Sequence, residues 1–265
     1  MPLPAQPVLF LWAISVLVQL TLFVFLFRTG NFRTLPFLTF YVALNLSQAG
    51  LMLFLYSRFA PSPHYVYLLG WGSEAVTLIV QAFAAAEALR LVLKPYPGIW
   101  GLSWRVLTLS GGVVVLVAAY AAGNMDWVLV RADRGYHLTF AVAFIACQLL
   151  VRYYAIAIPR AYKLLLAGFC TYSVCMVLMN TVFQSILWGR YANYTMIWDL
   201  LTMLPFAIFQ LLCLIALWKR LPEDAREPAW SSDEVYRRLT PEISEQLRLL
   251  NSRLARMWKP EARSE

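Results

Sequence analysis

Seven long apolar stretches separated by short connections dominate this chain of 265 residues. Each stretch is close to the ~20 apolar residues that a helix needs to cross ~30 Å of hydrocarbon. We therefore predict an all-α fold, a polytopic membrane bundle of seven transmembrane helices that occupies residues 1–218. The approximate spans are 8–27, 36–57, 66–93, 104–123, 136–157, 163–187 and 196–218.

The distribution of Lys and Arg gives the predicted bundle a direction. The first, third and fifth connections carry eight basic residues, whereas the second, fourth and sixth carry four. The side that is richer in Lys and Arg is expected to face the cytoplasm. We therefore predict a multi-pass protein of the cell (inner) membrane, with the N-terminus outside and the C-terminus in the cytoplasm.

Composition excludes several classes of partner and site. Charged residues make up 14% of the chain, and its net charge is +8. The basic residues before residue 219 stand mainly at the ends of apolar stretches, so the lipid bilayer explains them and nucleic acid is not expected as a partner. The four cysteines have no disulfide or zinc spacing and are interpreted as packing residues.

The cytoplasmic tail, residues 219–265, contains one predicted amphipathic helix at 241–258. Thr240 followed by Pro241 is typical of an N-cap and a first helical turn. Apolar residues then recur from Ile243 to Met257 at alternating steps of four and three. About two heptads of this kind suit either a helix on the inner membrane surface or a short coiled coil. We favour the surface helix, and the tail helix also offers a contact to a second copy or a membrane-protein partner.

Polar side chains inside the predicted spans are the candidate functional residues, because ionisable groups there are costly. Glu74 lies about eight residues into the third span, ~12 Å along the helix. Gln81 follows seven residues later on the same helix face. With the predicted orientation, most of these polar residues fall in the outer half of the bundle. We predict an outward-facing polar pocket that consists of Glu74, Gln81, Asn45, Gln48, Asn180 and Asp199.

An alternative interpretation is that these side chains only link helices, each contributing about 0.6 kcal/mol. Asn and Gln fit that interpretation, whereas a carboxylate at the depth of Glu74 needs a partner or a proton. Near the inner end of the third span, Glu87 has Arg90 three residues on and Arg152 at a similar depth. Since residues three apart on a helix are neighbours, we predict a structural ion pair among these groups.

Enzyme and cofactor signatures are absent from the sequence. There is no H-E-x-x-H and no G-x-S-x-G motif, and no histidine is counted inside a span, since His64 and His137 fall near the outer ends of the predicted spans. We therefore expect no enzyme activity, no metal site and no cofactor. The helix number and orientation resemble microbial rhodopsins, but no lysine lies inside the seventh span to attach retinal.

Two segments carry a more specific resemblance. They are Phe32-Arg-Thr-Leu-Pro-Phe37 with Tyr41, and Trp71-Gly-Ser-Glu-Ala75 with the Leu-Arg and Lys-Pro-Tyr sequences at 89–90 and 94–96. These segments cover about a quarter of the chain and resemble bacterial seven-helix integral membrane proteins of unknown function. The resemblance implies a membrane bundle and no activity.

Three functional interpretations remain open, and we favour a sensory or signalling module because almost nothing lies outside and a structured tail lies inside. The second is a small-solute transporter of 3+1+3 helix design, in which the first three helices and the last three are parallel copies. The segment from Trp71 to Lys94 in the third span resembles the segment from Trp198 to Lys219 in the seventh. The third is a structural or accessory subunit of a membrane complex. A transporter is expected to have a helix broken near the midplane, and Pro205 in the seventh span permits one.

Overall fold

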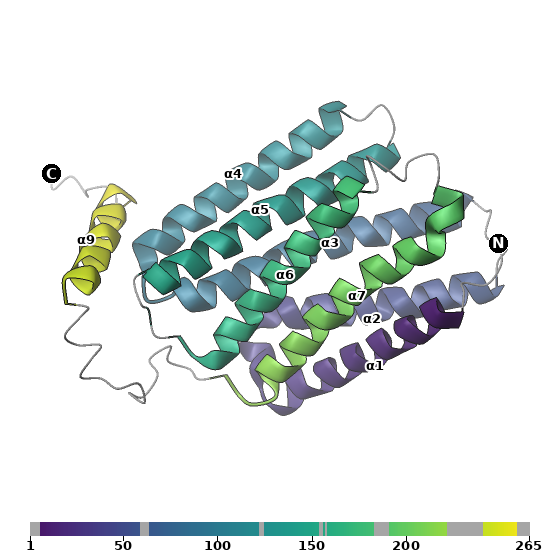
Figure 1. Cartoon of the computed structure of the whole chain (residues 1–265), viewed down its shortest axis with the longest axis horizontal. Coiled ribbons are helices and arrows are strands. Elements are labelled where there is room, and N and C mark those ends of the chain that lie inside the picture. Colours follow the sequence, from purple (N-terminus) through teal and green to yellow (C-terminus); the bar gives the residue numbers. More distant parts are fainter. Residues whose placement is uncertain are drawn as a thin grey trace, which may run out of the picture.

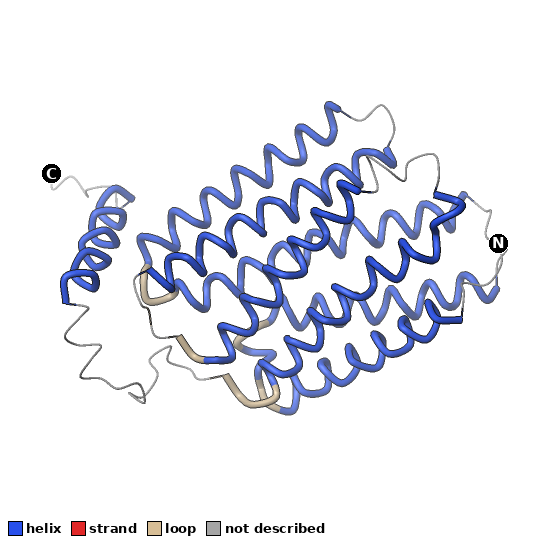
Figure 2. Tube along the Cα trace, viewed as in Figure 1, coloured by secondary structure: helices blue, strands red, loops and turns tan. Residues whose placement is uncertain are grey.

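The computed structural model describes residues 6–58, 64–121, 125–153, 156, 158–182, 191–221 and 241–258. In this part of the chain every regular element is a helix (Figures 1 and 2). The predicted fold class is confirmed, because seven helices are long and apolar enough to cross a membrane and a separate helix follows near the C-terminus. The elements are α1 (Gln6–Arg28), the 3-10 helix η1 (Asn31–Arg33), α2 (Pro36–Arg58), α3 (His64–Leu93), α4 (Pro97–Ala121), α5 (Met125–Tyr153), α6 (Arg160–Val182), α7 (Tyr191–Leu217) and α9 (Pro241–Trp258).

The seven long helices run alternately up and down, so the molecule has two ends (Figure 1). We call the end that carries the α1–α2, α3–α4 and α5–α6 connections and the exit from α7 the tail end, because α9 lies beside it. The opposite end, where α1, α3, α5 and α7 begin, is the far end. The predicted orientation places the tail end in the cytoplasm.

Helix α3 is the central element of the bundle. It contacts α2, α4, α5 and α6, while α1 contacts both α2 and α7 and so closes the ring. The alanines Ala84, Ala85 and Ala88 on α3 are almost fully buried. Small side chains let neighbouring helices approach closely, which is the main source of packing energy where lipid removes the hydrophobic drive between helices.

Asn31 fixes the point at which the chain leaves the bundle. Gly30, with φ of 75°, ends α1 in the left-handed conformation that glycine adopts without strain. The buried Asn31 amide then donates to the carbonyl oxygens of Leu217 (3.3 Å) and Lys219 (3.0 Å), and its oxygen accepts from the Leu221 N–H (2.8 Å). The tail therefore starts from a rigid anchor.

Helix α5 differs most from its predicted span. It begins at Met125 rather than near 136, and its apolar, membrane-length part covers Arg131–Tyr153. Charged residues at 126–134 lower the local hydropathy, but a helix does not need hydropathy where its polar side chains find partners inside the protein. Helix α7 is one continuous helix through Pro205, so the break that the proline permitted does not occur.

Candidate functional site

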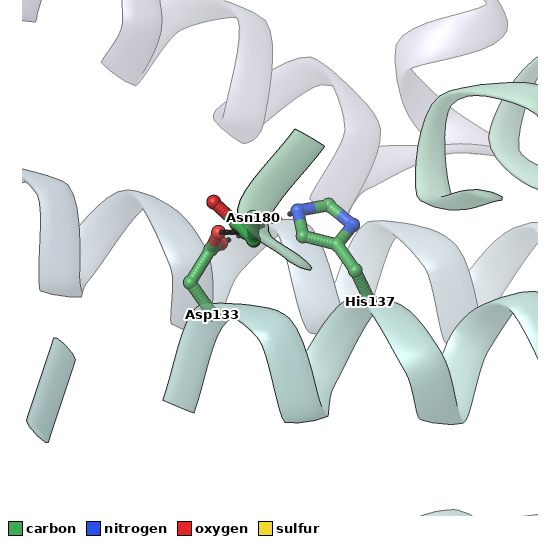
Figure 3. Close-up of polar contacts among 3 residues, drawn as sticks. All are labelled: Asp133, His137 and Asn180. Atoms are coloured by element: carbon green, nitrogen blue, oxygen red, sulfur yellow. Dashed lines mark hydrogen bonds and ion pairs between the residues drawn. The ribbon is translucent and has the colours of Figure 1, made fainter. Parts of the chain in front are cut away.

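A group of polar residues in mutual contact joins α5 to α6 in the far half of the bundle (Figure 3). Asp133 and His137 are four residues apart on α5, which places them on one helix face. His137 Nε2 lies 3.3 Å from Asp133 Oδ1. Asn180 Nδ2 on α6 donates to Asp133 Oδ2 at 2.6 Å. The Asp133 carboxylate therefore joins a histidine of its own helix to an amide of the next.

His137 is enclosed on every side but keeps one polar atom without a partner. Its side chain is 1% exposed, and its ring meets Tyr172 edge to face at 5.2 Å between centroids. The contact with Asp133 assigns the ring proton to Nε2, which leaves Nδ1 as an acceptor. Nδ1 is buried and has no hydrogen-bond partner. A buried polar atom without a partner costs about 1–3 kcal/mol of folding free energy.

A second polar group links α2 to α3. Gln48 Nε2 donates to Ser73 Oγ (3.2 Å) and to Glu74 Oε2 (3.0 Å), and Thr77 Oγ1 donates back to Gln48 Oε1 (3.1 Å). Glu74 is exposed, whereas Thr77 is buried.

The two groups lie on neighbouring helices, because α3 contacts both α5 and α6. The resulting site draws on four helices, α2, α3, α5 and α6. We call it the far-end cluster; it consists of Gln48, Glu74, Thr77, Asp133, His137 and Asn180.

The other predicted pocket residues fall outside this cluster. Gln81 is buried beside the Tyr172 hydroxyl, one layer nearer the tail end. Asn45 turns its amide to the Tyr41 carbonyl oxygen of its own helix at 2.8 Å. Asp199 belongs to α7, but its side chain lies outside the described part of the structure. Of the residues predicted to form the pocket, Glu74 and Gln48 are hydrogen-bonded to each other, while Asn180 bonds to Asp133.

The sequence interpretation missed Asp133 and misplaced His137. It put both at the outer edge of the bundle and counted no histidine inside a span, which is wrong for His137. That residue stands twelve positions into α5, about 18 Å along the helix at 1.5 Å per residue. The i, i+4 spacing of the two residues was the available signal. The other histidine, His64, is the first residue of α3, and its side chain is not described.

Glu87 has a different partner from the one predicted. Its Oε2 accepts the backbone N–H of Leu38 at 3.0 Å. The first N–H groups of a helix lack partners within the helix, and a carboxylate there also suits the helix dipole. Among the described side chains no ion pair joins Glu87 to Arg90 or Arg152, both of which are exposed. Glu87 on α3 therefore caps the start of α2.

An aromatic layer lies on the tail side of the far-end cluster. Phe169 stacks on Phe144 with 5.4 Å between ring centroids and lies 4.7 Å from Phe209. Tyr172 stacks on Phe209 at 5.2 Å and touches His137 with its edge. The three phenylalanines are at most 2% exposed. The layer joins α5, α6 and α7 and packs the bundle tightly below the cluster.

Helix α9 is docked at the opposite end. Asn251 Oδ1 accepts the Gly98 N–H at 2.8 Å, and α9 contacts α4 along its first turns (Figure 1). Leu254 packs against the buried core. Helix α4 packs on α5, so the helix that carries His137 and the tail helix are both in contact with α4.

No protein-family model, curated protein or solved structure matches the chain. Within the described residues, no three His, Cys, Asp or Glu side chains gather closely enough to hold a metal ion. The seven apolar helices are compatible with an integral membrane protein in contact with lipid.

Proposed function

We propose that the protein is a sensory or signalling module of the cell (inner) membrane, with no catalytic step of its own. The far-end cluster receives a small polar ligand from outside, and the docking of α9 on α4 reports its occupancy in the cytoplasm. The observation that carries the proposal is His137, which is buried at 1% exposure with an unpartnered Nδ1 beside a shared carboxylate.

A ligand that hydrogen-bonds within the cluster must compete for Asp133, because that carboxylate already holds both His137 and Asn180. Any shift in this sharing moves α5 relative to α6. The ring of His137 also rests on Tyr172, which stacks on Phe209. Tightly packed interiors switch between discrete arrangements rather than deforming gradually, so a small change at the cluster is expected to reach the tail end.

Transport by the same bundle is less well supported. A helix with an unwound middle is the usual carrier of a substrate site in such proteins. Helix α7 passes through Pro205 without interruption, and α3 is continuous from His64 to Leu93. The aromatic layer of Phe144, Phe169 and Phe209 also lies between the far-end cluster and the tail end. These features favour a closed site over a passage.

Hydrogen–deuterium exchange of residues 241–258 tests the proposal in the full chain in nanodiscs. The variants are Asp133→Asn and Asn180→Leu, with Thr181→Val as the matched control, because Thr181 is the exposed neighbour of Asn180 on α6. We expect both cluster variants to change the protection of α9 and the control to leave it unchanged. Wild-type protection of α9 in two folded cluster variants would exclude signalling from this site.

A further inference from the structure

A groove opens between α4 and α5 on the tail half of the bundle, away from the far-end cluster. It has a volume of about 470 Å³, and α3 closes it from behind. Helix α4 contributes residues from Ile99 to Ser110, helix α5 from Leu138 to Leu150, and the end of α3 contributes Leu89 and Leu93.

Helices α4 and α5 approach each other closely just beyond the far side of the groove. At Gly135 on α5 an added Cβ would lie 2.8 Å from Val114 Cγ1 on α4, so the two helices touch closely there. The apolar part of α4 has 6% of its residues buried, and so it leaves most of its surface to the membrane.

The wall of the groove is apolar even where hydroxyl groups line it. Ser103 donates to the Ile99 carbonyl oxygen, Ser110 to that of Val106, and Thr139 to that of Gly135, each within its own helix. These hydroxyls therefore need no partner from an occupant. A hydrocarbon chain fits such a wall, whereas a polar solute gains no hydrogen bond from it.

The groove has the depth of one leaflet. From Ile99 to Ser110 the α4 wall extends roughly 16 Å at 1.5 Å per residue. The hydrocarbon core of a bilayer is ~30 Å thick, so one leaflet supplies about half of it. The groove ends at the tail end, where a lipid of that leaflet has its headgroup.

Two basic residues follow the groove-lining segments of α3 and α5 at the tail end. Lys94 directly follows Leu93, and Arg152 lies two residues after Leu150; both are exposed. Among the described side chains neither takes part in an ion pair. Cations near the membrane surface attract anionic headgroups.

We propose that the groove between α4 and α5 is a binding site for one anionic phospholipid of the tail-end leaflet. One acyl chain occupies the groove, and the headgroup phosphate lies between Lys94 and Arg152. The site is separate from the far-end cluster and does not depend on the sensory role. A lipid held there would also occupy the contact between α5 and α4, the helix on which α9 docks.

Native mass spectrometry of the full chain tests the site. The protein is released from nanodiscs of equal phosphatidylglycerol and phosphatidylcholine with identical acyl chains, and retained lipids are counted. We expect the wild type to keep one phosphatidylglycerol. Ala146→Phe, which fills the groove from α5, is expected to lower the retained fraction at least about tenfold, equivalent to ~1.4 kcal/mol.

The matched control is Ala13→Phe, the same change at an exposed position in the membrane span of α1, which is expected to behave as wild type. Ser103→Leu fills the groove from α4 and serves if the phenylalanine variant unfolds. The paired Lys94→Gln, Arg152→Gln variant is expected to lose the preference for phosphatidylglycerol and to keep a lipid, with Arg28→Gln as its control at the same end.

Three outcomes would overturn the proposal. The first is equal retention of both lipids by the wild type. The second is unchanged retention in folded Ala146→Phe and Ser103→Leu variants. The third is a dimer that Ala146→Phe dissociates, because a second copy of the chain would then fill the groove.

Discussion

Helices α3 and α4 follow one another in the chain and both have membrane length, but they occupy opposite situations in the fold. The apolar part of α3 has 56% of its residues buried, and that of α4 has 6%. Helix α3 is surrounded by α2, α4, α5 and α6, whereas α4 is held by α5, α9 and weaker contacts with α3. Apolar character therefore predicts which segments enter a membrane and says little about which face protein.

The difference between the two helices lies in side-chain size and in polar contacts. Helix α3 carries Ala84, Ala85 and Ala88 on its buried surface, and its Glu74 and Glu87 bond to α2. Helix α4 carries large side chains that face outwards, such as Leu109 and Leu116, which are 71% and 70% exposed. In lipid, close approach and polar contacts hold helices together, and only α3 has both.

The largest effect is expected from Leu89→Ala on α3, compared with Leu116→Ala on α4. Leu89 is 2% exposed, so its removal leaves a cavity among α3, α4 and α5. We expect a loss of about 2–3 kcal/mol in the free energy of unfolding, the lower part of the range for buried leucines, because lipid supplies no hydrophobic drive. Leu116→Ala should change it by less than about 0.5 kcal/mol. Reversible unfolding in mixed micelles measures both, and equal losses would contradict the comparison.

Overpacking tests the small residues of α3. Ala84 is 0% exposed, and a leucine there has no room, so Ala84→Leu is expected to destabilise by about 1–3 kcal/mol. The control is Gly111→Leu on α4, since nothing lies within 4 Å of an added Cβ at Gly111. Thermal unfolding should show a clear drop for the first variant and at most a small change for the second. A stable Ala84→Leu protein would mean that α3 is less closely packed than its burial indicates.

The sequence predicted the fold because the membrane imposes it. Backbone groups must be paired inside each segment, so long apolar stretches become helices, and the tail helix followed from the Pro241 start and the apolar repeat. Burial could not be predicted in the same way, since α3 and α4 look alike in hydropathy. The close contact of Gly135 with Val114, beyond the far side of the groove between α4 and α5, is also not revealed by any pattern along the chain.

The candidate site was predicted in part. Glu74 and Gln48 were both placed in the predicted pocket because polar groups in a span need partners, and the structure joins them. Asp133 and His137 were lost because charged residues at the start of α5 resemble a loop when hydropathy is averaged. Glu87 was assigned to Arg90, three residues on, and to Arg152 at a similar depth, but it bonds instead to the start of α2, 49 residues away in the chain.

The polar contacts of the two helices provide a third and smaller effect. Gln48→Leu removes the partner of Ser73, Glu74 and Thr77 on α3. We expect a loss of about 1 kcal/mol, above the usual value for a link between membrane helices because a carboxylate is involved. Thr108→Val on α4 is the control, since that hydroxyl bonds only to the Trp104 carbonyl oxygen of its own helix. If neither variant changed the free energy of unfolding, the Gln48 hydrogen bonds would contribute no more to stability than a surface contact.

The smallest effect is expected from Asn251→Ala, which removes the side chain that accepts the Gly98 N–H at the start of α4. One neutral hydrogen bond contributes about 0.5–1.5 kcal/mol, and here that energy holds α9 rather than the bundle. Amide exchange within 241–258 should therefore rise severalfold, while the unfolding of the seven helices stays at its wild-type value. Ser252→Ala is the matched control, because Ser252 bonds to the Leu249 carbonyl oxygen of α9 itself. If the bundle were destabilised as well, α4 would depend on α9 for its position. Helix α4 would then be anchored more firmly than its low burial implies.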